Sequence, residues 1–427
     1  MRAISIAVTI LAGAFLAVPV CAGPLDLGLP PLSNVSGTLG GITTRADAGL
    51  DTDLRLVRDS VGRPSAPRLI AKDRSGFHVV RGEVLALSPN DASLEVAHRL
   101  NFSVIRRETL DSLGLNVTVL QIPDGMSTAE ALDALHRADP AGAYDLNHLY
   151  GPSGSDKREA PDKLRAADLA HPNRSVRIGM IDAGFDPHLG VFESASVTTK
   201  DCGTRTVVTT EHGTAVASLL VGSDDNIASG LPGAALYAAD VFCGSPTGGN
   251  ALAIVRALAW LAANNVTVVN VSLCGPANVL LAAAVQAFQK QGRVIVAAVG
   301  NDGPAAGIEY PAGYPGVVGV TSVDDANEIQ TEANRGADVA FAARGVEVAV
   351  AGMHGGHDTV SGTSFAAPIV AARFSLLLPM ADSRAVFEAW TRLQRAAKHL
   401  GPPGRNDIFG YGLLDRPHFT DAVTAVQ

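Results

Sequence analysis

The chain has 427 residues, of which 47% are hydrophobic, 18% are charged and 5% are aromatic. This length and composition suit a globular α/β protein with one large core and room for a smaller unit. The formal net charge of -9 at pH 7, in a sequence without a basic block, argues against nucleic-acid binding.

Residues 1–22 have the pattern of an export signal. Arg2 is the charged start, residues 3–18 are apolar, and Cys21 and Ala22 are small residues before a cleavage point at Gly23. The alternative is an uncleaved anchor. We therefore expect an exported protein, periplasmic or extracellular, with no membrane span after signal removal.

Removal of the signal would leave three cysteines, Cys202, Cys243 and Cys274. Export implies an oxidising compartment, so we expect one disulfide. Cys202 and Cys243 both lie in turn-rich segments, and we predict that they pair and leave Cys274 free.

The first part of the chain divides into an extension and a small folded unit. Residues 23–76 are rich in Pro, Gly, Asp and Arg, which predicts a linker or loosely docked extension with one short helix at 51–58. Residues 77–150 instead show alternating strand and helix patterns. Strands are expected at 79–87, 102–110, 115–121 and 143–149, and helices at 91–100 and 127–138. This order is that of a ferredoxin-like α+β unit.

The large domain is predicted within residues 151–427, after a polar linker that ends near residue 174. Strands are expected at 176–181, 235–241, 266–273, 293–299 and 317–323, and helices from 212, at 251–264, at 279–291 and from 364. This alternation predicts a doubly wound, mostly parallel sheet with helices on both faces. Ligands of such sheets bind beyond the carboxyl ends of the strands.

Four chemically suited residues fall at such ends. Asp182 and Asn301 follow predicted strands, whereas His212 and Ser364 begin predicted helices, the second with Pro368 in its first turn. A serine nucleophile needs an imidazole as base and a buried carboxylate to orient it. The Asn301 amide and the Ser364 N–H would stabilise the oxyanion. An N-cap serine on a core helix is the alternative for Ser364 taken alone.

The segments around these residues resemble the signature blocks of the subtilisin-like serine proteases, over about residues 151–425. The blocks are Asp182-Ala183-Gly184, His212-Gly213-Thr214, Ala298-Val299-Gly300-Asn301 and Gly362-Thr363-Ser364. The resemblance implies an endopeptidase that forms an acyl-enzyme, with Asp182, His212 and Ser364 as the triad. An α/β-hydrolase esterase is disfavoured because that fold expects another residue order.

The blocks also depart from the family pattern. Ala183 stands where relatives usually carry Ser or Thr, and Ala215, Ser218 and Cys274 replace a usual His, Gly and Gly. Loss of a hydroxyl at 183 would weaken the support of Asp182. A catalytically impaired member that acts as a peptide-binding or regulatory module therefore remains the alternative.

The resemblance further implies where a substrate binds. The edge that pairs with the peptide backbone would be Ser272, Leu273, Cys274 and Gly275. The pocket for the side chain before the scissile bond would be lined by Ala297, Ala298 and Val299. Glu309 would lie near the base of that pocket and favour Lys or Arg. A solvent-facing Glu309 in a loop is the alternative.

The unit at 77–150 resembles the propeptide of this family, which is a folding aid and intramolecular inhibitor. A permanent accessory domain is the alternative. We expect self-cleavage at Tyr150–Gly151, or after Lys157 or Arg158 if the pocket selects basic residues. We expect a monomer that acts on proteins or peptides.

No cofactor is required by this chemistry, and a structural calcium ion is expected at most. Asp224, Asp225 and Asn226 are the nearest to a calcium-binding run, but they lack EF-hand spacing. His354 and His357 form an H-x-x-H pair without an evident third ligand. We interpret both segments as loops and predict no metal site from them.

Overall fold

The computed structural model describes residues 70–152, 156–159, 175–200, 208–245 and 248–414. The expected export signal, the 51–58 helix and Cys202 lie outside these residues. None of the helices within them is long and apolar enough to cross a membrane.

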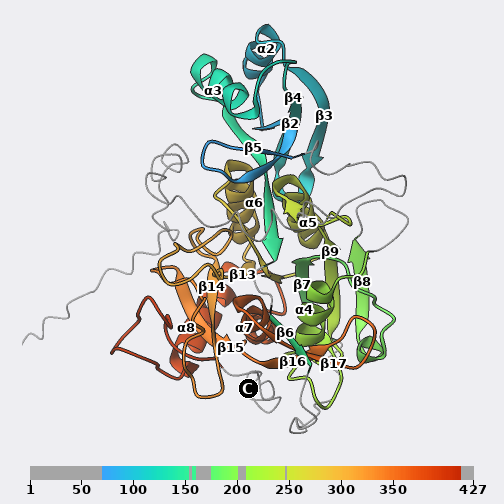
Figure 1. The fold of residues 1–427 in the computed structure, drawn as a ribbon, viewed down its shortest axis with the longest axis vertical. Coiled ribbons are helices and arrows are strands. Elements are labelled where there is room, and N and C mark those ends of the chain that lie inside the picture. The colour runs from blue at the N-terminus through green and yellow to red at the C-terminus, as the bar shows by residue number, and fades with distance from the viewer. Residues whose placement is uncertain (1–69, 153–155, 160–174, 201–207, 246–247, 415–427) are drawn as a thin grey trace, which may run out of the picture. The chain divides into compact units, whose positions relative to one another are not determined.

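The small domain is an antiparallel sheet with two helices (Figure 1). Its strands lie in the order β5-β2-β4-β3, and β1 also pairs with β2. The strands are β1 (Ile70–Lys72), β2 (His78–Leu87), β3 (Ser103–Leu110), β4 (Leu115–Gln121) and β5 (Ala143–Pro152), and the helices are α2 (Asp91–Arg99) and α3 (Thr128–Ala138). A short η2 (Asp111–Leu113) joins β3 to β4. From β2 onwards the order is β-α-β-β-α-β.

Local sequence signals explain the helix boundaries of this domain. Ser127 and Glu130 form a capping box at the start of α3. The cap of α2 is Asn90, whose side chain accepts from Ser93 N, rather than the Asp that follows it. The sheet begins at Ile70, inside the segment expected to be a linker, because that segment pairs with β2.

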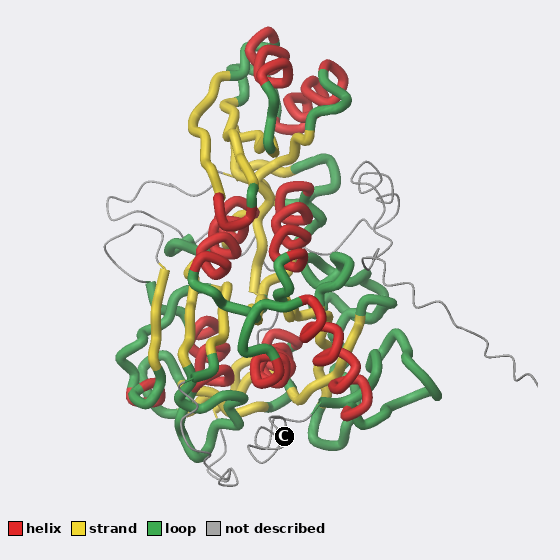
Figure 2. Tube along the Cα trace, turned by 180° about the vertical axis from the view of Figure 1, so that it is seen from behind, coloured by secondary structure: helices red, strands yellow, loops and turns green. Residues whose placement is uncertain are grey.

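A parallel seven-stranded sheet forms the large domain, which confirms the predicted α/β class (Figure 2). Its order is β15-β14-β13-β11-β7-β9-β8. These strands are β7 (Arg177–Asp182), β8 (Ser196–Lys200), β9 (Ala235–Asp240), β11 (Val268–Val271), β13 (Val294–Ala298), β14 (Val318–Val323) and β15 (Val339–Arg344). Strands β11, β13 and β14 are buried along their whole length, as expected of a sheet covered on both faces.

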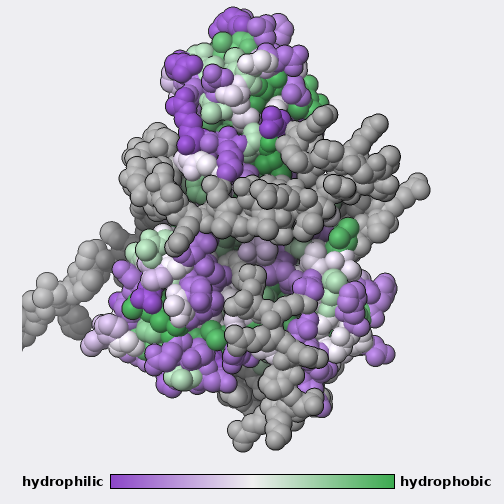
Figure 3. Space-filling view, in the orientation of Figure 1, coloured by the Kyte–Doolittle hydropathy of each residue, from purple (hydrophilic) through white to green (hydrophobic). Residues whose placement is uncertain are grey.

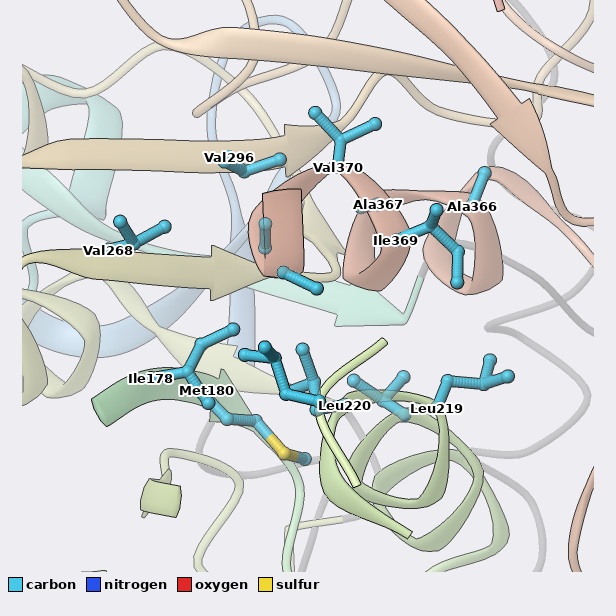
Figure 4. Close-up of a cluster of buried hydrophobic side chains, with 14 of the residues drawn as sticks. Ile178, Met180, Leu219, Leu220, Val268, Val296, Ala366, Ala367, Ile369 and Val370 are labelled. Carbon is cyan, nitrogen blue, oxygen red and sulfur yellow. The ribbon is translucent and has the colours of Figure 1, made fainter. Parts of the chain in front are cut away.

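Two hydrophobic clusters lie on the two faces of this sheet. One contains α4 (Glu211–Val221) and α7 (Thr363–Leu377), with α8 (Ser383–Ala396) beside them. The other contains α5 (Ala251–Ala263) and α6 (Val279–Lys290). Figure 4 shows part of the first cluster, in which Ile178 of β7 and Leu220 of α4 point toward one another and Val370 of α7 lies beside Val296 of β13. His212 and Ser364 lie in the first turns of α4 and α7, so the packing of these two helices positions both residues.

Strand β5 continues from the small domain into the large one, between α5 and α6 (Figure 1). There it pairs with β10 (Gly249–Asn250) on one side and with β12 (Leu273–Cys274) on the other. Its side chains also complete helix ends, because Asn147 Oδ1 accepts from Leu252 N and Asp145 Oδ2 accepts from Val279 N. The expected strand ended at residue 149, so the structure extends it by three residues.

Strand β6 (Asp156–Glu159) falls in the segment predicted to be an exposed linker. It pairs with β17 (His357–Ser361), which also pairs with β16 (Val348–Ala351).

The surface of the small domain is largely polar, apart from an apolar patch on the side of β3 (Figure 3). Val104 and Ile105 of β3 are 45% and 41% exposed.

Candidate active site

Asp182 and His212 form a hydrogen-bonded pair. Asp182 ends β7 and is fully buried, and its Oδ1 accepts from His212 Nδ1 at 2.8 Å. The first turn of α4 holds His212 there because Gly213 packs on the Ala183 carbonyl, where a Cβ would come within 2.4 Å. Thr210 caps the helix by accepting from Gly213 N. Sequence and structure therefore agree on this pair.

The second oxygen of Asp182, Oδ2, has no hydrogen-bond donor in the described part of the chain. Oδ1 also accepts from Ala183 N at 2.7 Å, but none of the described residues donates to the buried Oδ2. A Ser or Thr at position 183 would carry a hydroxyl close to this carboxylate, whereas Ala183 offers only a methyl group. Burying a carboxylate oxygen without a hydrogen-bond donor costs free energy.

Ser364 lies in the first turn of α7 and is fully buried. Its Oγ donates to the Ser272 carbonyl at 3.1 Å, and His212 Nε2 has no hydrogen-bond partner among the described residues. Phe365 packs against the His212 ring with centroids 5.5 Å apart. The structure thus brings the serine and the Asp–His pair to one place without the Ser–His hydrogen bond. Such bonds often tighten only in the substrate complex.

Ser272 also supplies a hydrogen bond that Pro368 cannot make within α7. The helix begins at Thr363, so Pro368 lies beyond its first turn, contrary to the prediction. A proline there cannot donate to the carbonyl four residues earlier, which is that of Ser364. The Ser272 hydroxyl donates to this carbonyl instead, at 2.9 Å. Ser272 and Ser364 are therefore joined by two hydrogen bonds, in each of which the hydroxyl of one residue donates to the carbonyl of the other.

Asn301 lies beside the same helix start. Its Oδ1 accepts from Thr363 N at 3.1 Å, which leaves the amide nitrogen as the donor end. Asn301 follows β13 and Gly300, and Gly300 has a φ of +106° that favours glycine. Because Thr363 precedes Ser364, this contact holds the amide within one residue of the serine backbone N–H. The two predicted oxyanion donors are therefore neighbours.

The predicted substrate edge is occupied by the chain itself. Leu273 and Cys274 pair antiparallel with Pro152 and Gly151 of β5. On the other side of β5, Gly249 pairs with Tyr150. This second edge was missed by sequence reasoning, although the run Gly248-Gly249-Asn250 is a signal of close backbone approach: a Cβ at Gly248 would come within 2.1 Å of the Tyr150 carbonyl.

Tyr150 anchors β5 in the large domain. It is fully buried, its ring covers Gly275, and its hydroxyl donates to Pro276 O at 2.7 Å. Burial raises the pKa of this hydroxyl well above its usual range. The register pairs Leu273 with Pro152 and Cys274 with Gly151, so Tyr150 lies beyond the Cys274 pair, on the side away from Ser272. This geometry disfavours a cut at Tyr150–Gly151.

Glu309 lies between the substrate edge and the oxyanion loop. Gly300 leaves room for it, because a Cβ there would come within 2.4 Å of Glu309 Oε2. Burial, together with the nearby charge of Asp302, raises the pKa of Glu309 to about 8, although a hydrogen bond with Cys274 opposes this rise. Ala297, Ala298 and Val299 are fully buried.

The remaining predicted features lie elsewhere. Cys243 is disulfide-bonded and Cys274 is a buried thiol outside any disulfide; the partner predicted for Cys243, Cys202, is outside the described residues. His357 Nε2 lies 2.9 Å from Asp224 Oδ1, so the H-x-x-H segment contacts the acidic run. In the described part of the chain, no three His, Cys, Asp or Glu residues are grouped as metal ligands.

Comparison with solved structures places this fold in one class. Fervidolysin from Fervidobacterium pennivorans, a keratinolytic enzyme related to subtilisin, superposes with a TM-score of 0.67 at 19% identity, over 82% of this chain and 61% of its own. The epidermin leader peptide processing serine protease EpiP of Staphylococcus aureus gives 0.60 at 17% identity, over 81% of this chain and 99% of its own. The fold is therefore subtilisin-like.

Sequence relatives point to the same class. Residues 173–412 match the Subtilase family, Peptidase_S8, and the chain belongs to that family of serine peptidases. Subtilisin DY of Bacillus licheniformis is 31% identical over 265 residues, 59% of this chain and 91% of its own. The minor extracellular protease Epr of Bacillus subtilis (strain 168) is 30% identical over 265 residues, also 59% of this chain, but only 40% of Epr is covered.

Proposed function

We propose that this subtilase is an exported serine endopeptidase that is made as a self-processing zymogen. The observation that carries the proposal is the Asp182–His212 pair at 2.8 Å beside the helix start that holds Ser364. Extracellular Epr among the relatives and the signal-like residues 1–22 support export. Protein or peptide substrates follow from the paired edge of β12.

Each residue has one chemical task in this mechanism. His212 Nε2 accepts the Ser364 proton as Oγ attacks the substrate carbonyl, and later gives it to the leaving amine. Asp182 holds the other ring nitrogen and stabilises the imidazolium. The Asn301 amide and the Ser364 N–H stabilise the oxyanion. Ser364 Oγ must first turn from the Ser272 carbonyl toward His212. Water then hydrolyses the acyl-enzyme, with His212 as the base.

The small domain acts as the inhibitor in this proposal. Its strand β5 fills the edge where a substrate backbone would pair, between β10 and β12. Pro152 faces Leu273, next to Ser272, whereas Asp156 faces Ser361, three residues before Ser364. Only three residues separate Pro152 from Asp156. Because the described ends on either side, Pro152 and Asp156, both pair with segments next to Ser272 and Ser364, we expect the cut between them rather than at Tyr150–Gly151 or after Lys157 or Arg158.

Expression of the full chain beside Ser364→Ala tests the proposal. We expect the first to be cut between residues 152 and 156, with a new amino terminus identified by mass spectrometry. The Ser364→Ala chain should stay whole, and only the first should react with an active-serine reagent. An uncut chain that the reagent does not label would overturn the proposal. A whole but labelled chain would instead support a permanent accessory domain.

The unsupported Oδ2 of Asp182 favours a second candidate, an impaired subtilase that binds peptides without efficient cleavage. Ala183→Ser separates the two. If the missing hydroxyl limits catalysis, kcat should rise about tenfold or more with little change in KM, since one hydrogen bond to a charged group contributes about 1.5–3 kcal/mol. Ala183→Val is the matched control that adds bulk without a donor. Equal kcat in all three chains would exclude this cause of impairment.

A further inference from the structure

A chain of buried hydrogen bonds runs from the interior of the parallel sheet to Ser364. Asn270 lies in β11, and its Nδ2 donates to Ser272 Oγ at 2.9 Å. Ser272 Oγ in turn donates to the Ser364 carbonyl at 2.9 Å. All three residues are fully buried. Because Ser272 Oγ accepts from Asn270, its own proton is directed toward Ser364.

Pro368 is the reason that the Ser364 carbonyl takes a donor from outside α7. In an uninterrupted helix the N–H of residue 368 would donate to this carbonyl, but proline has no N–H. A buried carbonyl without a donor destabilises the conformation that buries it. The direction of this peptide group is therefore set by Ser272 rather than by the helix.

The backbone that carries the nucleophile is held on both sides. Asn301 Oδ1 accepts from Thr363 N, one residue before Ser364, and Ser272 donates to the carbonyl of Ser364 itself. The Ser364 N–H and Cβ lie between these two points of attachment. A change in the backbone of Ser364 would therefore move both the proposed oxyanion donor and the attacking oxygen, and small displacements of reacting groups cost much of a catalysed rate.

Ser272 also connects this backbone to the edge that pairs with the docked chain. It directly precedes β12, in which Leu273 pairs with Pro152 of β5. One side chain therefore joins the edge to the helix start that carries Ser364. The position of the serine relative to a paired chain then depends on the same hydrogen bond.

We propose that Ser272 and Asn270 are positioning residues for the peptidase reaction. The Ser272 hydroxyl, directed by Asn270, takes the place of the N–H that Pro368 lacks and holds the Ser364 backbone in its reactive orientation. Both residues act through this backbone. The inference rests on the proposed peptidase function and gives Pro368 a part in it, because the proline leaves the carbonyl to a donor beside the substrate edge.

A double-mutant cycle with Pro368→Ala tests the proposal. Pro368→Ala restores an N–H within α7, so the Ser364 carbonyl then has a donor with or without the Ser272 hydroxyl. In the processed wild-type background, Ser272→Ala should lower kcat about tenfold; in the Pro368→Ala background it should lower kcat by less than about twofold. KM for a peptide should stay constant, because the substitution leaves the backbone of the edge intact. Active sites are counted with an active-serine reagent, so that kcat refers to folded protein.

Three further variants serve as controls. Ser375 is a buried serine of the same helix, and its Oγ donates to Ala371 O at 2.9 Å, away from Ser364. Ser375→Ala should leave kcat unchanged. Ser272→Thr keeps the hydroxyl and should keep most of the activity. Asn270→Ala frees the Ser272 hydroxyl to turn, so kcat should fall in the wild-type background and not in Pro368→Ala. This last comparison carries the test if Ser272→Ala does not fold.

The outcomes separate the inference from the proposed function. An equal fall of kcat in both backgrounds, no fall at all, or the same fall in Ser375→Ala would overturn the inference, while cleavage by the wild-type protein leaves the peptidase function standing. If the wild-type protein cleaves no peptide, the proposed function fails, and the four chains of the cycle are compared by urea unfolding. Destabilisation by Ser272→Ala that Pro368→Ala abolishes then supports the exchange of donors, and equal destabilisation in both backgrounds overturns it.

Discussion

Two carboxylates attach the small domain to the large one, and their surroundings shift their pKa values in opposite directions. Asp145 of β5 accepts from Val279 N at the start of α6, and burial raises its pKa although His148 and the backbone N–H groups oppose the shift. Glu108 of β3 contacts Arg256 of α5. Burial opposes ionisation there too, but hydrogen bonds and charges of Arg256 and Arg106 lower its pKa.

The difference shows what kind of contact holds β5 in the cleft. Asp145 is a largely buried acceptor at the start of α6. His148 lies 3.7 Å from it and His136 also acts on its charge, and Asp145 contributes chiefly by accepting hydrogen bonds from backbone N–H groups. The Glu108–Arg256 pair lies nearer the surface, with the Arg256 side chain 40% exposed, so solvent screens it. We therefore expect the interface to depend on β5 and its buried side chains far more than on the ion pair. One assay ranks them: urea release of the small domain in the Ser364→Ala chain, followed by tryptophan fluorescence.

The largest effect is expected from Tyr150→Ala. This side chain is fully buried against Gly275 and Pro276, and truncation of such an aromatic costs about 3 kcal/mol, or roughly a hundredfold in the equilibrium for release. Tyr150→Phe keeps the ring and loses only the hydrogen bond to Pro276 O, so it should cost about 1 kcal/mol. Equal losses in the two variants would show that the ring burial contributes nothing.

Much of the parallel sheet was predictable because its strands are continuous apolar runs between helix starts. The same alternation of strands and helices predicted that Asp182 and Asn301 follow strands and that His212 and Ser364 begin helices. The extension of β5 was not predictable, because Gly151-Pro152 is a typical chain breaker and becomes strand only by pairing with β12. The charged run of β6 likewise becomes strand only through β17. Tertiary pairing overrode local propensity in both.

The orientation of single side chains was also beyond the sequence. The rotation of Ser364 Oγ toward Ser272 depends on which carbonyl lies near, and residue 272 is 92 positions away. By contrast, the missing donor at Asp182 could be anticipated, since Ala183 lies next to it in the chain and has no hydroxyl. Contacts between sequence neighbours are predictable, and those between distant segments need the fold.

The intermediate effect is expected at Asp145. Asp145→Ala removes an acceptor for the first N–H of α6 and should cost about 1 kcal/mol. Asp145→Asn tests the pH dependence. Because the pKa is raised in the folded state, stability falls as pH rises from the ordinary aspartate range to the raised value. Asp145→Asn should lose this fall, which begins near the ordinary aspartate pKa of about 4, whereas the exposed control Asp124→Asn should keep it.

The smallest effect is expected at the ion pair. Arg256→Gln should weaken the interface by about 0.5 kcal/mol, since screened pairs contribute between about 0 and 1 kcal/mol. Its pH dependence has the opposite sign to that of Asp145: the pKa of Glu108 is lowered in the folded state, so the contribution is present above pH 4.5 and is lost as pH falls below it. In about 0.5 M salt the difference between wild type and Arg256→Gln should vanish. A loss that exceeds that of Tyr150→Ala, or that persists in salt, would reverse the ranking, because the interface would then depend on the Glu108–Arg256 charges rather than on β5.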